Sequence, residues 1–148
     1  STYEMFGLHL RSVLPRTSLD TLAEAPEAEW SLLAHANVLY ALAPNVSILV
    51  QDSHYVIVQS DPESVDRTRV TLTTVGRPVG EGEGAERRRQ YLEANHRFTV
   101  ATLVEDFELA EEIQSGLATG ANASIRLGRY EDAIVDWHRA LDARLATI

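Results

Sequence analysis

A long stretch without helix-breaking residues is the feature that most constrains the fold of this chain. Residues 85–115 contain neither glycine nor proline and are rich in Ala, Glu, Leu and Arg, which favour helix. At about 1.5 Å per residue, such a stretch forms a rod of roughly 45 Å. We predict one long helix over about 85–118, ending near Gly116 and Gly120.

A shorter helix is predicted at about 130–145, after Gly128. Its apolar and aromatic residues recur at the spacing of one helical face. These residues are Ile134, Trp137, His138, Leu141 and Leu145. We interpret Trp137 and His138 as core packing.

The first half of the chain has the alternation of β-strands. Val46, Ile48 and Val50 alternate with polar residues, and 54–59 repeats the alternation after a short polar turn, which predicts a β-hairpin. Further strands are predicted at about 3–10, 37–42 and 67–75, whereas the apolar residues 30–36 are ambiguous.

Strands followed by helices predict an α+β fold, in which a curved antiparallel sheet at about 3–76 is covered by the long C-terminal helices. The chain has 148 residues, of which 45% are hydrophobic, and this is sufficient for one core. We therefore treat 1–148 as a single domain.

Composition excludes several classes of function. A net charge of −9 argues against a nucleic-acid partner. There is no apolar run of about 18 residues and no signal-peptide pattern, so we expect a cytoplasmic protein without a membrane span. Without cysteine, the chain holds neither a disulfide nor a thiolate-bound cluster. Phosphate-binding loops and nucleophile motifs are also missing from the sequence.

One acidic residue of the predicted long helix lies on its apolar face. At about 100° per residue, Ile113 and Leu117 fall within roughly 20° of Asp106, whereas the other acids nearby fall about 100° or more away. A carboxylate that faces a core is unfavourable unless it is paired, protonated or bound to a metal. The sequence therefore marks Asp106 as a candidate functional residue.

Three interpretations of Asp106 remain open. It pairs with an arginine of the sheet, it is exposed by a local rotation of the helix, or it is a metal-binding or catalytic carboxylate. Asn95, Thr99 and Thr102 lie on the same face and would line a pocket, although helical threonines often bond back to the preceding turn. His96, at the edge of this face, either lines that pocket or is a half-exposed helix residue.

Several segments together resemble a known family. The run from Val104 to Leu117, with its Glu-Asp and Gln-x-Gly-Leu elements, resembles the long C-terminal helix of Rieske-type ring-hydroxylating oxygenase α subunits. Gly128 to Glu131 and Trp137 to Leu141 resemble that family's closing segments. Upstream, Tyr40 to Asn45 and the following hairpin resemble its sheet, and Asp61 to Arg69 resembles the connection into the next strand.

The resemblance implies a helix-grip (START-like) catalytic domain with a mononuclear Fe(II) held by two histidines and one carboxylate. Asp106 occupies the carboxylate position, and His96 and Leu103, with Asn95, Thr99 and Thr102, would line the substrate pocket. The enzyme would hydroxylate or demethylate an apolar or aromatic substrate with O2. A ferredoxin or reductase would pass on electrons from NAD(P)H, and the assembly would be a homotrimer or would combine α with β subunits.

The sequence departs from the family in two respects. It has no counterpart of the family's two iron-binding histidines, and it has no cysteine for the 2Fe-2S Rieske cluster, which would belong to an N-terminal domain. We therefore interpret the chain as a truncated catalytic domain that is inactive alone. The alternative is a helix-grip module that binds a small molecule without redox chemistry.

Overall fold

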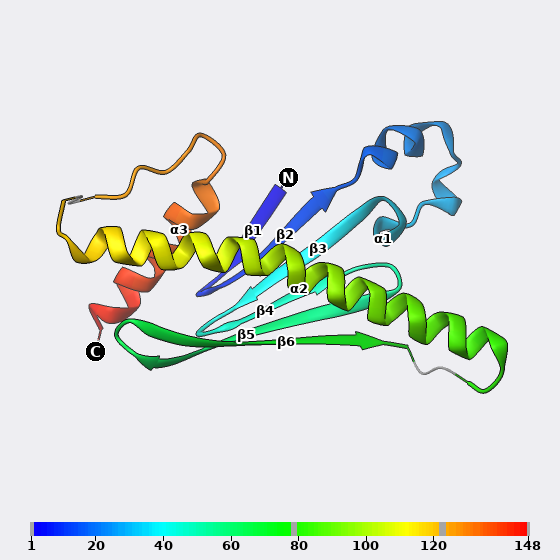
Figure 1. The fold of residues 1–148 in the computed structure, drawn as a ribbon. Coiled ribbons are helices and arrows are strands. Elements are labelled where there is room, and N and C mark those ends of the chain that lie inside the picture. Colours follow the sequence, from blue (N-terminus) through cyan, green and yellow to red (C-terminus); the bar gives the residue numbers. More distant parts are fainter. Residues whose placement is uncertain (1, 78–79, 122–123, 148) are drawn as a thin grey trace.

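The chain folds as an antiparallel sheet followed by two long helices (Figure 1). The structure is a computed structural model and describes residues 2–77, 80–121 and 124–147. Its six strands follow one another across the sheet in chain order, because each connection returns the chain beside the strand just completed. The predicted α+β class with a helix-grip arrangement is confirmed.

The elements have the following bounds. The strands are β1 (Thr2–Phe6), β2 (His9–Pro15), β3 (Ala36–Leu42), β4 (Val46–Val50), β5 (His54–Ser64) and β6 (Arg67–Gly76). The α-helices are α1 (Leu32–His35), α2 (Glu83–Ala118) and α3 (Asp132–Leu145). Two 3₁₀ turns, η1 (Thr17–Glu24) and η2 (Glu27–Glu29), precede α1.

Two predicted segments differ from the structure. The single strand expected at 3–10 is a hairpin, since Gly7 has a φ of 64° and reverses the chain so that Phe6 pairs with His9. Most of the segment from Asp61 to Arg69, expected to connect two strands, belongs to the strands themselves, because β5 and β6 stay paired almost to the turn. Pro62 is tolerated there because β4 no longer pairs with this part of β5.

Helix α3 packs against β1 and β2. The Tyr3 hydroxyl donates to Asp136 Oδ2 at 2.8 Å, and the indole N–H of Trp137 donates to the carbonyl of Leu8 at 3.1 Å. The prediction that His138 belongs to the core is wrong, because the neighbouring Trp137 faces the sheet and leaves His138 exposed. Asn122, in the segment between the two predicted helices, lies outside the described residues.

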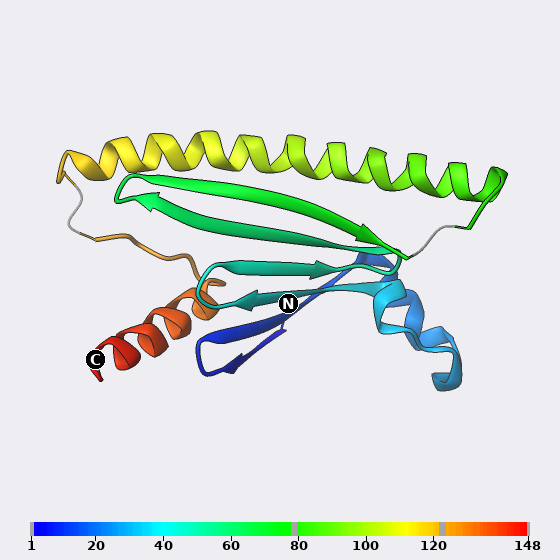
Figure 2. The same ribbon diagram turned by 90° about the horizontal axis from the view of Figure 1, so that it is seen from below.

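Helix α2 lies along one side of the sheet, closest to β6 and far from β1 (Figure 2). With 36 residues, it is about 54 Å long. The packed core is small and includes Leu10, Val38 and Val56 of the sheet, with Ala85 at the beginning of α2. Within the described residues, no helix has the length and apolarity needed to cross a membrane.

Candidate functional site

Asp106 lies in the C-terminal half of α2 and is exposed. The expectation that it is buried is therefore not met within this chain. Its apolar neighbours on the same face are exposed as well, including Leu109 (57%) and Ile113 (51%). The sequence pattern thus identifies an apolar face, but the sheet of this chain does not cover it.

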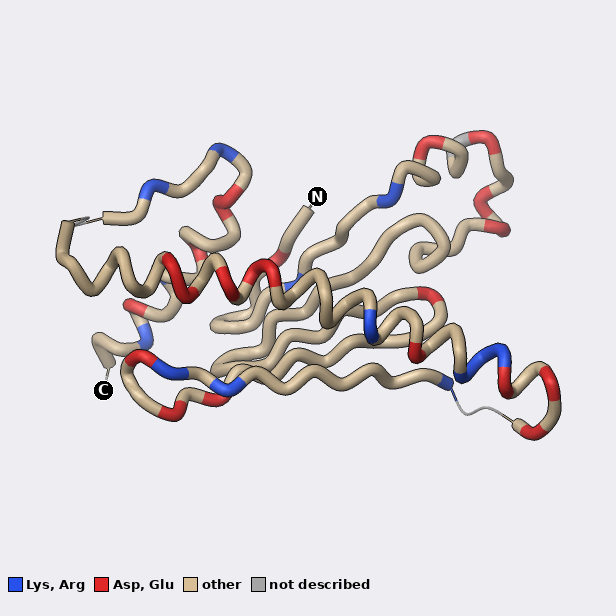
Figure 3. The backbone as a smooth tube through the Cα atoms, in the orientation of Figure 1, with Lys and Arg blue, Asp and Glu red and all other residues tan. Residues whose placement is uncertain are grey.

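No ion pair among the described residues includes Asp106, so the pairing with a sheet arginine is not observed. Four other exposed acids, Glu105, Glu108, Glu111 and Glu112, surround it on this half of the helix. Figure 3 shows these acids on the C-terminal half and the arginines at the beginning of α2. The carboxylate is thus available for a cation that approaches the apolar face.

The polar residues expected to line a pocket bond along their own helix. Thr99 donates to the Asn95 carbonyl at 2.9 Å, and Thr102 donates to the Phe98 carbonyl at 3.0 Å. The Asn95 amide donates to the Tyr91 carbonyl at 2.9 Å. These are the back-bonds that helical Thr and Asn side chains commonly form, and they satisfy the hydroxyls without a ligand.

His96 and Leu103 are both half-buried, on the side of α2 that approaches the sheet. Nδ1 of His96 lies 3.0 Å from the Thr74 hydroxyl of β6. This contact joins the middle of the helix to the sheet. The structure therefore gives His96 a contact in the fold that its sequence position alone does not reveal.

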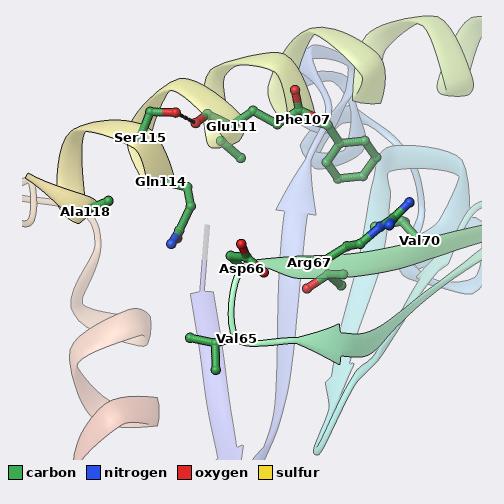
Figure 4. Close-up of a pocket in the computed structure, with 11 residues that line it drawn as sticks. Val65, Asp66, Arg67, Val70, Phe107, Glu111, Gln114, Ser115 and Ala118 are labelled. Carbon is green, nitrogen blue, oxygen red and sulfur yellow. Dashed lines mark hydrogen bonds between the residues drawn. The ribbon is translucent and has the colours of Figure 1, made fainter.

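A cleft of about 840 Å³ separates the β5–β6 turn from the C-terminal half of α2 (Figure 4). Asp106 does not line it, but the next residue, Phe107, and Ala110, one turn later, do. In Figure 4 the Gln114 side chain extends from α2 toward Asp66 in the turn. The cleft mixes apolar and polar walls and opens beside the helix segment that carries Asp106.

The residues available for a metal ion are few. Over 2–77, 80–121 and 124–147, no group of three or more His, Cys, Asp or Glu side chains is close enough to hold one. Asp106 fits the carboxylate ligand of an iron site in its chemistry and its lack of an ion-pair partner among these residues. This part of the chain thus offers one ligand and not a complete site.

A buried histidine at the beginning of β5 is not distinguished by any motif in the sequence. His54 is 4% exposed, and its Nδ1 lies 2.9 Å from the Ser53 hydroxyl oxygen. Burial lowers the pKa of His54 below its ordinary value, and the nearby Arg88 guanidinium lowers it further. The available signal was the strand alternation, in which His54 and Val56 share the inward side.

The family model for the ring-hydroxylating α subunit (catalytic domain) matches residues 5–147. No match was found among curated proteins or among solved structures. The family match includes the sheet, the long helix with Asp106 and the closing helix, in the order in which the structure connects them. The chain therefore belongs to the family of ring-hydroxylating oxygenase α subunits, within their catalytic domain.

Proposed function

We propose that Asp106 is the carboxylate ligand of a mononuclear Fe(II) site in a ring-hydroxylating oxygenase. The observation that carries this proposal is the family match over 5–147, which includes the helix on which Asp106 stands. The exposed carboxylate, the apolar residues around it and the adjacent cleft support the proposal. A hard oxygen anion is a suitable ligand for ferrous iron.

The remaining ligands, two histidines, would come from polypeptide outside this chain, because the described residues offer no cluster that would complete the site. The chemistry supplied by a bound iron of this type is the activation of O2 for hydroxylation or demethylation. A Rieske 2Fe-2S cluster in a further domain would deliver electrons, since this chain lacks cysteine. By itself, the chain would be inactive.

The substrate would be apolar or aromatic and would approach Asp106 along the cleft beside α2. Phe107, Val70 and Ala110 offer apolar contact in the cleft, and the side-chain amide of Gln114 offers hydrogen bonds. The chain's own residues would thereby orient the substrate and exclude water on one side. None of the predicted pocket residues lines this cleft, so the part of the half-buried His96 and Leu103 in the substrate pocket stays a prediction.

The working enzyme would be cytoplasmic and would require partners. A ferredoxin or reductase that draws on NAD(P)H would reduce the cluster. A trimer of α subunits, with or without β subunits, would bring the cluster of one subunit near the iron of another. Membership of the family supports these assignments.

Iron binding by the intact protein tests the proposal. Asp106→Ala removes the proposed ligand, and Glu108→Ala removes an exposed acid on another face of the same helix, two residues away. After reconstitution with ferrous iron and removal of the excess, metal analysis should find iron in the wild type and in Glu108→Ala. Asp106→Ala should retain little.

Equal iron content in the two variants would refute Asp106 as a ligand. If the wild type binds no iron but takes up an apolar fluorescent probe, the alternative of a small-molecule-binding module is the better description. Secondary structure measured by circular dichroism should be the same in all three proteins, since both substitutions are at exposed positions.

A further inference from the structure

A compact set of polar contacts joins the first turns of α2 to the turn between β4 and β5. The Ser53 hydroxyl oxygen lies 2.9 Å from His54 Nδ1 and 3.2 Å from the Tyr91 hydroxyl oxygen. Arg88 donates to the Ser53 carbonyl at 2.7 Å. The rings of His54 and Tyr91 meet edge to face, with centroids 6.2 Å apart. We call Ser53, His54, Arg88 and Tyr91 the anchor.

The anchor continues into an unusually close contact between α2 and the sheet. His54 pairs across the β5–β6 ladder with Gly76. A Cβ added to Gly76 would lie 2.4 Å from Leu92 Cδ1, so the Leu92 side chain of α2 occupies the space that a larger residue would need. Thr74 and His96 add a hydrogen bond one turn further along the helix. Together these contacts fix the N-terminal half of α2.

The C-terminal half of α2 has no comparable attachment in the described residues. The side-chain hydrogen bonds of its Ser115, and of Thr119 just after it, return to carbonyls of the preceding turn. Between Tyr91 and Asp106 the helix rises by about 22 Å. Because a helix of this length behaves as a rod, its direction at Asp106 depends on how its first turns are held.

We propose that His54 is a positioning residue, which with Ser53, Tyr91 and Arg88 anchors α2 to the β4–β5 turn and so sets the place of Asp106. The anchor holds while the His54 ring is neutral and is weakened when the ring gains a proton. The consequence for iron rests on the proposed function of Asp106, whereas the anchor itself does not.

The charge dependence follows from the surroundings of His54. Burial and the Arg88 guanidinium both disfavour a positive ring. The other ionisable groups nearby are Tyr91, whose ring meets His54 edge to face, and Asp52 in the turn and Arg77 after β6, which are exposed. A positive charge on His54 would therefore repel the Arg88 guanidinium.

Hydrogen exchange of α2 in the intact protein, followed by mass spectrometry, tests the anchor directly. Arg88→Ala removes the bond to the Ser53 carbonyl, and Arg87→Ala removes a neighbouring exposed arginine from the same turn. Peptides from 84–96 should exchange on the order of tenfold faster in Arg88→Ala, because bonds to charged groups are the stronger ones. Arg87→Ala should match the wild type.

Removing a single hydroxyl gives a gentler second test. Tyr91→Phe should accelerate exchange of the same peptides by about 2- to 5-fold, since the lost hydrogen bond is neutral and partly exposed. Tyr55→Phe is its control, because no side-chain hydrogen bond to Tyr55 is found in the described part of the chain. Equal exchange within either pair of variants would overturn the anchor.

The pH profile separates positioning by His54 from a merely structural role. Relative to intrinsic exchange rates, the protection of 84–96 in the wild type should fall as the pH drops through the lowered pKa of His54. In His54→Gln, which does not titrate, the profile should be flat. The same acid dependence in His54→Gln would show that another group is responsible and would overturn the role of His54.

Iron content of Arg88→Ala and Arg87→Ala connects the anchor to Asp106. A lower iron content in Arg88→Ala alone is expected, and equal content would overturn the positioning of Asp106. The two proposals fail differently. If Asp106→Ala keeps its iron, the proposed ligand is wrong, whereas the exchange of 84–96 still reports on the anchor, because it needs no iron.

Discussion

Gly76→Ala is a sharp test of how closely α2 packs on the sheet. The added Cβ would lie 2.4 Å from Cδ1, 3.1 Å from Cδ2 and 3.3 Å from Cγ of Leu92. All three distances are below ordinary van der Waals contact, and the closest requires the Leu92 side chain or the helix to move. The backbone of Gly76 itself imposes no strain, since its φ is not positive.

The expected destabilisation follows from two opposing effects. Overpacking a well-fitted contact costs about 1–3 kcal/mol. Replacing glycine by alanine in a permitted conformation restricts the unfolded chain and returns about 0.4–1 kcal/mol. The net expectation is a loss of about 1 kcal/mol in the free energy of unfolding, because the displaced atoms are the ends of the half-buried Leu92 side chain and the overpacking is near the low end of its range.

A double-mutant cycle measures the energy of this contact. It compares the free energies of unfolding in urea of Gly76→Ala, Leu92→Ala and the double variant. Leu92→Ala alone is destabilising because it removes half-buried apolar surface. In the Leu92→Ala background, however, Gly76→Ala should lower the free energy of unfolding only slightly or raise it, since the alanine side chain then has room. An additive double variant, or a Gly76→Ala protein as stable as the wild type, would refute the close contact.

Five further outcomes are expected in urea unfolding. Asp106→Ala should change stability by less than about 0.5 kcal/mol, since the residue is exposed. Trp137→Phe should lose about 1 kcal/mol with the bond to the Leu8 carbonyl, whereas His138→Ala, on the exposed side, should be nearly neutral. Gly7→Ala should lose about 1 kcal/mol, because its positive φ strains an alanine. The stability contributed by His54 should be complete above about pH 6.5 and should be lost as the pH falls through its lowered folded-state pKa, a loss that His54→Gln should not show.

The strands could be predicted where side chains alternate, because alternation reflects a sheet with two different faces. Val46, Ile48 and Val50 give this signal, and β4 has the predicted bounds. The hairpin at Gly7 was missed because Tyr3 to Leu10 keeps an apolar pattern through the turn, and only the positive φ of the glycine shows the reversal. The long helix was predicted from the absence of helix breakers over many residues.

The candidate site could be predicted only in part. Periodicity places Asp106 among apolar residues, but it does not say whether anything covers that face, and here Leu109 and Ile113 are exposed beside it. The anchor could not be predicted, since it joins residues of a strand turn with Arg88 and Tyr91, far along the chain. A single sequence carries no periodic signal for such a contact.

The two halves of α2 differ in how they are held and in what they expose. The first half is held by polar contacts and by Leu92 against Gly76, whereas the second half presents Asp106 among exposed apolar residues. Covering that second face would remove apolar surface from water, which is favourable, but it would also desolvate a carboxylate, which costs several kcal/mol unless a cation neutralises it. A metal ion bound at Asp106 would therefore make it easier to cover this face. A covering segment that brings further ligands would in turn strengthen the binding of the metal ion. Under the proposal that Asp106 binds iron, metal binding and the covering of this face are thus expected to be thermodynamically coupled. The anchored half of α2 would hold the carboxylate in place during both events.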